Sequence, residues 1–260
     1  FMFVILFFVG AYFEDAYKKK ELPHFFKASA VLILAAAIGV CANLSNLYHT
    51  YEYSKETMRG KSELKQEGPA ANQTSSGLDR DYITNWSYGI GETLTLLVPN
   101  VKGGGCSTTL SQNETAMAKA NPMYGNLYSQ LTPYFGDQPW TAGPVYVGAF
   151  VVFLFILGCF IVKGPLKWAL LGATIFSILL SWGKNFMGLT DFFIDYIPMY
   201  NKFRAVSSIL VIAEFTIPLL AIFALKEILS KPDILKLKEN RTGVIVTLVL
   251  TAGVALILRS

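Results

Sequence analysis

The composition of this 260-residue chain is far more apolar than that of an average soluble domain, because 53% of its residues are hydrophobic and only 15% are charged. Its mean hydropathy is positive, which places it in the membrane class. The formal net charge of +4 is small, and the basic residues are spread over loops rather than clustered with stacking aromatic side chains. This pattern excludes a nucleic-acid-binding protein from our expectations and favours loop charges that set membrane topology.

The residues that usually hold metals and nucleotides do not form a recognisable pattern. The cysteines are odd in number and widely spaced, namely Cys41, Cys106 and Cys159. This spacing suits neither a disulfide framework nor a metal site, and His24 and His49 have no neighbours at ligand spacing. The glycines at 103–105 lack the lysine and helix that follow a phosphate-binding loop. We therefore expect no metal and no cofactor.

Apolar runs predict an all-α polytopic membrane protein with about five to six transmembrane helices. The runs cover residues 1–13, 28–42, 144–162, 168–182, 205–225 and 243–258. The chain opens directly in FMFVILFFVG without a preceding charged segment, so we expect residue 1 to lie within a helix of a longer protein. The last run has about 16 residues, which is short for a bilayer core of about 30 Å. We therefore expect the first and last spans to be truncated.

The long polar region at residues 43–143 separates residues 1–42 from residues 144–260, and the sequence predicts it to be a mostly helical outer-face insertion. A Glu- and Lys-rich stretch at 48–66 and a second stretch at 88–97 are the candidate helices. A linker rich in Gly, Pro, Asn and Ser at 68–77 lies between them. We expect three parts: two spans with a loop, this insertion, and the remaining spans.

The short basic loops predict the orientation of the chain. Residues 14–27, 163–167 and 226–241 together hold 11 Lys and Arg residues. Strict alternation of spans places all three loops on one side, which the positive-inside rule makes cytoplasmic. The 43–143 region and the outer-face loop at 181–204 then share the opposite side of the membrane.

The loop at 181–204 concentrates polar side chains between two apolar runs. Asp191 and Asp195 are four residues apart, so on a helix they share one face, with Thr190 placed to cap its N-terminus. Paired carboxylates can act as general acid and base, which makes these two weak catalytic candidates. An amphipathic helix lying on the membrane, with residues 192–194 dipped inward, explains the pattern equally well.

Charged residues at the entrance to the next apolar run offer a second kind of chemistry. The guanidinium group of Arg204, next to Lys202, can bind a phosphate bidentately or anchor a lipid headgroup. Glu214 lies inside the apolar run, nine residues from its outer end. Since an ionisable side chain is costly at that depth, we expect it to face the bundle interior with a partner, for function or for helix pairing. Pro218 would kink the same helix.

The segment GLDRDYITNWSYGIGETLTLLVPN combines aromatic rings with side chains that can bind hydroxyl groups. Its candidate sugar or acceptor contacts are Asp79, Asp81, Trp86, Tyr88 and Glu92. An interfacial helix with Trp and Tyr at the level of the lipid headgroups is equally compatible with this pattern.

Four long runs resemble the YfhO family of bacterial membrane proteins, in the form found in Bacteroides-type bacteria. They are NLSNLYHTYEYSKETMRGKSEL (43–64), GLDRDYITNWSYGIGETLTLLVPNVKGG (77–104), QPWTAGPVYVGAF (138–150) and SWGKNFMGLTDFFIDYIPMYNKFRAVS (181–207). That family is similar to the C-type glycosyltransferases, polytopic helical enzymes that take a sugar from a polyprenyl-phosphate carrier on the outer face of the membrane.

The resemblance implies glycosyl transfer at the outer face of the bacterial cytoplasmic membrane, without a cofactor. The donor would be a polyprenyl-phosphate-linked sugar, and the acceptor an envelope glycopolymer or lipid. Arg204, helped by Lys202, would hold the carrier phosphate, with Asn201 and Lys184 as further candidates. In such enzymes the catalytic base is an acidic residue of the first outer loop, which we expect to lie upstream of this chain.

Two functions of other classes stay open at this stage. In a non-enzymatic lipid or polysaccharide transporter, Glu214 and the kink at Pro218 would form part of a path. Transporters of this kind have a pair of corresponding interrupted helices, of which the sequence shows one. In a structural envelope membrane protein, the polar residues of the outer face would not matter for any activity.

Overall fold

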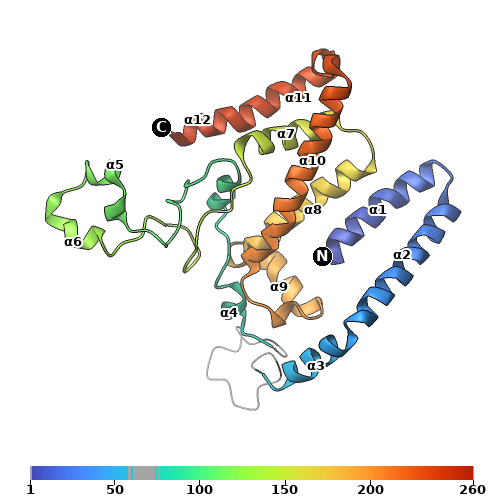
Figure 1. Cartoon of the computed structure of the whole chain (residues 1–260), viewed down its shortest axis with the longest axis horizontal. Coiled ribbons are helices and arrows are strands. Elements are labelled where there is room, and N and C mark those ends of the chain that lie inside the picture. Colours follow the sequence, from blue (N-terminus) through green and yellow to red (C-terminus); the bar gives the residue numbers. More distant parts are fainter. Residues whose placement is uncertain (1, 58–59, 61–73, 75–76, 260) are drawn as a thin grey trace.

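The computed structural model describes residues 2–57, 60, 74 and 77–259, and within them all regular structure is helical (Figure 1). This confirms the all-α class. The α-helices are α1 (Met2–Lys18), α2 (Leu22–Ala42), α3 (Leu44–Lys55), α4 (Arg80–Thr84), α5 (Glu114–Met117), α6 (Gly125–Tyr128), α7 (Ala149–Ile161), α8 (Pro165–Ser181), α9 (Met187–Tyr196), α10 (Val211–Ser230), α11 (Lys238–Leu248) and α12 (Val254–Arg259). The 3-10 turns are η2 (Gly91–Leu96), η3 (Leu110–Gln112), η4 (Pro122–Tyr124), η5 (Gly183–Phe186), η6 (Tyr200–Lys202), η7 (Val206–Leu210) and η8 (Pro232–Lys236), and a π-turn, η9 (Val249–Gly253), joins α11 to α12.

The core is built where α10 packs against both α7 and α8. Small residues allow this approach: a Cβ added at Gly158 of α7 would lie only 3.2 Å from Leu220 and Ala224 of α10. Leu220 and Ala224 are themselves completely buried. Such close helix contacts are how membrane helices associate, because lipid gives them no hydrophobic driving force.

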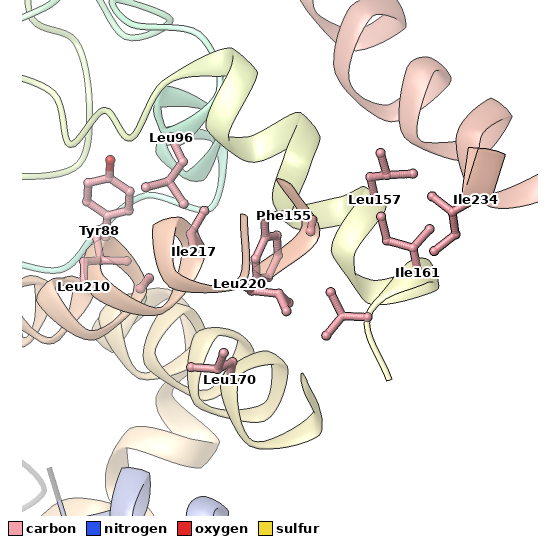
Figure 2. Packing of buried hydrophobic residues seen from close by; sticks show 13 residues of the cluster. Tyr88, Leu96, Phe155, Leu157, Ile161, Leu170, Leu210, Ile217, Leu220 and Ile234 are labelled. Atoms are coloured by element: carbon pink, nitrogen blue, oxygen red, sulfur yellow. The ribbon is translucent and has the colours of Figure 1, made fainter. Parts of the chain in front are cut away.

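The core runs the length of these helices (Figure 2). Tyr88 and Leu96, from the polar region, lie at one end beside Leu210, whereas Ile161 and Ile234 lie at the other end. The segment around Tyr88 is therefore packed onto the helical bundle rather than standing apart from it.

The N-terminal helices lie on the α8 side of this core. Helix α1 packs against α8, where Phe7 covers Gly172 and its ring meets Phe176 edge-on, with 5.6 Å between ring centroids. Helix α2 folds back along α1, and none of its residues is buried. At the C-terminal side, α11 packs against α7 through Gly243 and Phe160.

Three helices are long and apolar enough to cross a membrane, namely Leu22–Ala42, Val206–Ser230 and Asn240–Leu258. A fourth span is formed only if α8 and the following Gly183–Tyr196, which bend by 109°, are counted as one. By length and composition, the chain is a membrane protein. The predicted number of five to six spans is not established by these helices.

Two predicted spans have different bounds in the structure. The run at 144–162 yields a helix of only 13 residues, or about 20 Å, because the chain before it is not helical and Gly148 has φ of 113°. The last run is longer than we predicted: its helix begins in the polar turn at Lys238, so Asn240–Leu258 is 19 residues long.

The basic turns gather at one end of the helices (Figure 1). The connections at 19–21, 162–164 and 231–237 lie toward the upper right of the view, whereas α4 and α9 lie at the lower end. We call these two ends the basic end and the site end. The three basic connections therefore lie together, whereas the alternation of five to six spans stays a prediction.

The polar region is less regular than the sequence suggested. The predicted helix at 48–66 corresponds in part to α3, and most of the remainder of that stretch and of the 68–77 linker lies outside the described residues. The predicted helix at 88–97 is the short 3-10 turn η2 instead. Two glycines at its start, Gly89 and Gly91, disfavour a longer helix here.

Candidate functional site

Three segments, 77–104, 134–140 and 181–207, meet at the site end. Backbone bonds join the first to the third: the N–H of Tyr88 donates to Ser181 O at 2.8 Å, and that of Ser207 donates to Trp86 O at 3.1 Å. A small apolar cluster underneath joins the same segments through Leu78, Ile83, Ile194 and Val206. The segments that the sequence analysis singled out separately are thus one structural unit.

Asp191 and Asp195 share one face of α9, as their spacing predicted, and both bind Arg80. The guanidinium group lies 3.1 Å from Asp191 Oδ1 and 2.5 Å from Asp195 Oδ1. Arg80 is mostly buried, with 18% of its side chain exposed, whereas the carboxylates are about 40% exposed. The arrangement ties α4 to α9, which gives both carboxylates a structural role.

The predicted capping role of Thr190 is wrong. Helix α9 begins at Met187, directly after the 3-10 turn η5, so Thr190 lies inside the helix and is completely buried. Its hydroxyl donates to Gly183 O and Phe186 O at 3.0 and 3.2 Å. Of residues 192–194, Phe193 and Ile194 are buried and Phe192 is half-exposed, so the inward-facing side is narrower than we expected.

Arg204 is exposed and held between two aromatic rings. Its Nη1 donates to the Tyr82 hydroxyl at 2.8 Å, and its Cζ lies 5.6 Å from the Tyr82 ring centroid and 5.4 Å from that of Trp86. The hydrogen bond and these two cation–π contacts position the guanidinium group. Since that hydrogen bond uses one of five N–H donors, the group can still bind an anion bidentately.

An apolar cavity of about 470 Å³ adjoins Arg204. Its lining residues come from η6, η7 and the start of α10, and are Tyr200, Phe203, Arg204, Ala205, Val206, Ser208, Ile209, Val211 and Ile212. Burial raises the pKa of Tyr200 to about 12. Arg204 is the charged member of this lining, so the arrangement suits a molecule with an anionic head and an apolar tail.

The other predicted phosphate ligands are divided between two places. Asn201 and Lys202 belong to η6, close to Arg204 in sequence, and the carbonyl of Asn201 accepts a bond from Leu78 N at 3.0 Å. Lys184 instead donates through Nζ to the backbone carbonyl of Asp137 at 2.9 Å. Lys184, in η5, therefore contacts the neighbouring 134–140 loop rather than Arg204.

Glu92, predicted as a sugar contact, is buried, with 3% exposed. Its carboxylate accepts hydrogen bonds from Gly89 N at 2.6 Å, the Tyr134 hydroxyl at 2.6 Å and Asp137 N at 3.2 Å. Burial and the hydrogen bond to Glu92 raise the pKa of Tyr134 above its usual range, so the Tyr134 hydroxyl keeps its proton and donates to Glu92. Glu92 thus orders the 134–140 loop and is not available to an external ligand.

The remaining predicted sugar contacts differ in exposure. Tyr88 is buried in the core, its hydroxyl pairs with Thr95 Oγ1 at 2.5 Å, and burial raises its pKa to about 12. Asp79 and Asp81 are exposed at the start of α4, and Trp86 is half-buried beside Arg204. Trp86, Asp79 and Asp81 are accessible to a ligand, whereas Tyr88 is not.

The expectation for Glu214 is wrong. Its side chain is exposed, although it lies in the first turn of α10 and within the candidate span Val206–Ser230. The buried stripe of α10 passes through Ala213, Ile217 and Leu220, which leaves Glu214 outside it. The polar contact between helices is made by hydroxyl groups instead, Thr174 of α8 and Thr216 of α10, at 2.7 Å.

The sequence analysis missed the loop at 134–140. The carboxylate of Asp137 is exposed and accepts a bond from Asn185 Nδ2 at 2.8 Å. The indole N–H of Trp86 donates to Trp140 O at 3.2 Å, and Ser207 Oγ donates to Gln138 Oε1 at 3.3 Å. The run QPW, part of the family resemblance, was the available signal for this loop.

Among the described residues, no group of three or more His, Cys, Asp or Glu side chains could hold a metal ion, and the three cysteines are free. Comparison of the chain with protein-family models, with curated proteins and with solved structures found no match. The family resemblance therefore stays a prediction, and the geometry around Arg204 is the structural basis for a proposed function.

Proposed function

We propose that this chain is part of a membrane glycosyltransferase of the YfhO type with five to six spans. It would move a sugar from a polyprenyl-phosphate carrier to an envelope glycopolymer or lipid acceptor. The reaction would take place at the outer face of the bacterial cytoplasmic membrane.

The observation that carries this proposal is the position of Arg204 beside an apolar cavity. A polyprenyl phosphate combines two acidic oxygens with a long apolar chain. The guanidinium group, oriented by the rings of Tyr82 and Trp86, offers paired donors to the oxygens, and the cavity of about 470 Å³ offers space for the first part of the chain. Lys202, two residues away, adds positive charge.

The distribution of charge supports the proposed orientation. The basic turns lie at the opposite end of the helices from α4, whose Tyr82 binds Arg204, and the positive-inside rule makes the basic end cytoplasmic (Figure 1). Arg204 precedes Val211, where α10 begins, so the proposed phosphate position lies where a span emerges from the membrane. A lipid-linked donor that stays in the bilayer would meet the site there.

In the family that the chain resembles, the catalytic carboxylate belongs to the first outer loop, so we assign that role to neither Asp191 nor Asp195. Asp191 and Asp195 are bound to Arg80 and would serve the scaffold. In the proposed enzyme, this chain would supply the phosphate site.

The test is transfer of radiolabelled sugar from polyprenyl-phosphate donors to envelope extracts, by membranes containing the full-length protein. A hydrogen bond to a charged group contributes about 1.5–3 kcal/mol, so we expect Arg204→Ala to lower transfer about tenfold or more. Arg204→Lys keeps the charge but loses the paired donors, so its rate of transfer should lie between those of the wild type and Arg204→Ala. Arg241→Ala is the matched control, because Arg241 is also exposed but belongs to α11 near the basic end.

Unchanged transfer by Arg204→Ala would overturn the proposal. A transporter of lipid or polysaccharide is the second candidate, favoured by the 109° bend between α8 and Gly183–Tyr196, since broken spans line transport paths. Folded full-length protein that transfers sugar from no donor, but moves lipid across vesicles, would support that candidate.

A further inference from the structure

The 134–140 loop is anchored on both sides of its exposed residues. Near its start, buried Glu92 accepts hydrogen bonds from the Tyr134 hydroxyl and from Asp137 N. At its end, the indole N–H of Trp86 donates to Trp140 O at 3.2 Å. Because both anchors belong to the 77–104 segment, the side chains between them are positioned before any ligand arrives, which reduces the entropy lost on binding.

The carboxylate of Asp137 can accept further hydrogen bonds. It is exposed, one of its oxygens accepts a bond from Asn185 at 2.8 Å, and it belongs to none of the ion pairs seen among the described residues. A carboxylate has about four acceptor positions, so several remain for hydroxyl donors.

Aromatic rings flank this carboxylate in sequence. Trp140 is 56% exposed and Phe135 is 65% exposed, while their backbone atoms are fixed: Trp140 O binds Trp86, and Phe135 N donates to Lys102 O at 3.1 Å. An exposed ring next to hydroxyl acceptors matches a pyranose, which has an apolar C–H face and a rim of hydroxyl groups. Exposed Trp rings also suit a membrane anchor, and the experiment below distinguishes the two roles.

The loop lies next to the proposed phosphate position. Trp86 touches both: Arg204 Cζ lies 5.4 Å from the centroid of its ring, and its indole N–H binds Trp140 O. Ser207, three residues after Arg204, donates to Gln138 of the loop at 3.3 Å. A sugar joined directly to a phosphate on Arg204 would therefore be within reach of this loop.

We propose that residues 137–140 bind the sugar that the lipid phosphate carries. Asp137 accepts hydrogen bonds from its hydroxyl groups, and Trp140 packs against its apolar face. Glu92 is a positioning residue, which acts by holding the loop. The inference rests on the proposed function, because Arg204 holds the phosphate to which this sugar is attached.

The experiment compares the binding of two kinds of lipid by the full-length protein in detergent, using native mass spectrometry. One probe is polyprenyl phosphate without a sugar. The others are the same carrier bearing glucose, mannose or N-acetylglucosamine. We expect the wild type to bind at least one sugar-bearing carrier about tenfold more tightly than the bare carrier, and Asp137→Asn and Trp140→Ala to lose that preference while binding the bare carrier normally.

Matched controls come from the basic end. Asp233→Asn and Trp168→Ala replace residues of the same types and should keep the preference for the sugar-bearing carrier. The Asp233 side chain is 82% exposed and Trp168 is 62% exposed. Glu92→Gln should lower the preference by disordering the loop. The measurement for Glu92→Gln is limited proteolysis: cleavage at 134–140 should be faster than in the wild type, while the variant still binds the bare carrier.

The outcomes separate this inference from the proposed function. Arg204→Ala that binds the bare carrier normally would overturn the proposed function, and the inference with it. If Arg204→Ala weakens that binding but Asp137→Asn and Trp140→Ala keep the preference for sugar, only the sugar subsite is overturned. Equal weakening of both kinds of lipid by Trp140→Ala would identify a membrane anchor, and a wild type without any preference would also overturn the subsite.

Discussion

Arg80 and Asp195, 115 positions apart in the chain, form an ion pair of 2.5 Å that holds α4 against α9. Arg80 binds Asp191 of the same helix face as well, at 3.1 Å. The pair thus joins the two segments that also carry Tyr82 and Arg204. Its main effect on any activity at Arg204 would be to keep Tyr82 within hydrogen-bond distance of Arg204.

We predict that Asp195→Asn lowers the free energy of unfolding by about 1 kcal/mol, because the carboxylate is partly exposed and solvent screens the pair. Arg80→Met should show a coupling of similar size in a double-mutant cycle, measured by thermal unfolding in detergent. The pair Lys236 and Asp233, 2.8 Å apart and 82% exposed on both sides, should give a coupling near zero. Loss of sugar transfer by Asp195→Asn at unchanged thermal stability would show instead that this carboxylate is catalytic.

Glu214 provides a second prediction, because its exposed position differs from the buried one expected of a helix-pairing carboxylate. Glu214→Gln should leave the free energy of unfolding within about 0.5 kcal/mol of the wild-type value, as for other surface substitutions. Thr216→Val should cost about 0.6–1.7 kcal/mol, because it removes the bond to Thr174 between α8 and α10. Both are measured by thermal unfolding. A strong loss of stability with Glu214→Gln would mean that the carboxylate has a buried partner.

The sequence was sufficient for some of these features and not for others. Apolar runs identify the long helices, and the spacing of Asp191 and Asp195 identifies their shared face. The partner of these carboxylates could not be predicted, because Arg80 is more than 100 residues away and nothing local marks it. The orientation of Glu214 was misjudged because an apolar run does not show which face of its helix is buried, and here the buried stripe passes through Ala213 and Ile217 instead.

The candidate site was predicted only in part, because the sequence shows residue types but not the long-range contacts that position them. Arg204 and Trp86 were identified by residue type, and the structure brings them together with 5.4 Å between the guanidinium carbon and the ring centroid. Asp137 has no local pattern, and its exposed position depends on long-range bonds to Glu92 and Asn185. Tyr88 and Glu92 look like ligand-binding residues in sequence, yet burial assigns them to the core and to the loop anchor.

Tyr200, which is partly buried, predicts how stability changes at alkaline pH. Burial raises the pKa of Tyr200 to about 12, above the value of about 10 of a tyrosine in an unfolded chain. Between pH 10 and 12 the unfolded state therefore loses its proton first, and each pH unit lowers the free energy of unfolding by up to about 1.4 kcal/mol. Below pH 10 this contribution is fully present.

Tyr200→Phe should make stability less dependent on pH in this window, because no ionisable hydroxyl remains at the site. Thermal unfolding in detergent at pH 9, 10 and 11 measures the slope for both proteins. Tyr196→Phe is the control, since Tyr196 is 73% exposed on the neighbouring helix. Equal slopes for Tyr200→Phe and the wild type would contradict the predicted burial of this hydroxyl.

Gly158 provides the most direct test of the packing between α7 and α10. An added Cβ would lie 3.2 Å from Ala224 Cβ, Leu220 Cγ and Leu220 O, and the last of these is backbone that cannot move aside. Gly158→Val should therefore lower the free energy of unfolding by about 1–3 kcal/mol through overpacking. Gly39→Val is the matched control, because a Cβ added there in α2 has nothing within 4 Å. Ala224→Gly combined with Gly158→Ala should restore part of the stability lost by Gly158→Ala alone, since it removes one of the two side-chain contacts. Equal thermal midpoints for Gly158→Val and Gly39→Val would show that these helices do not pack this closely in the membrane.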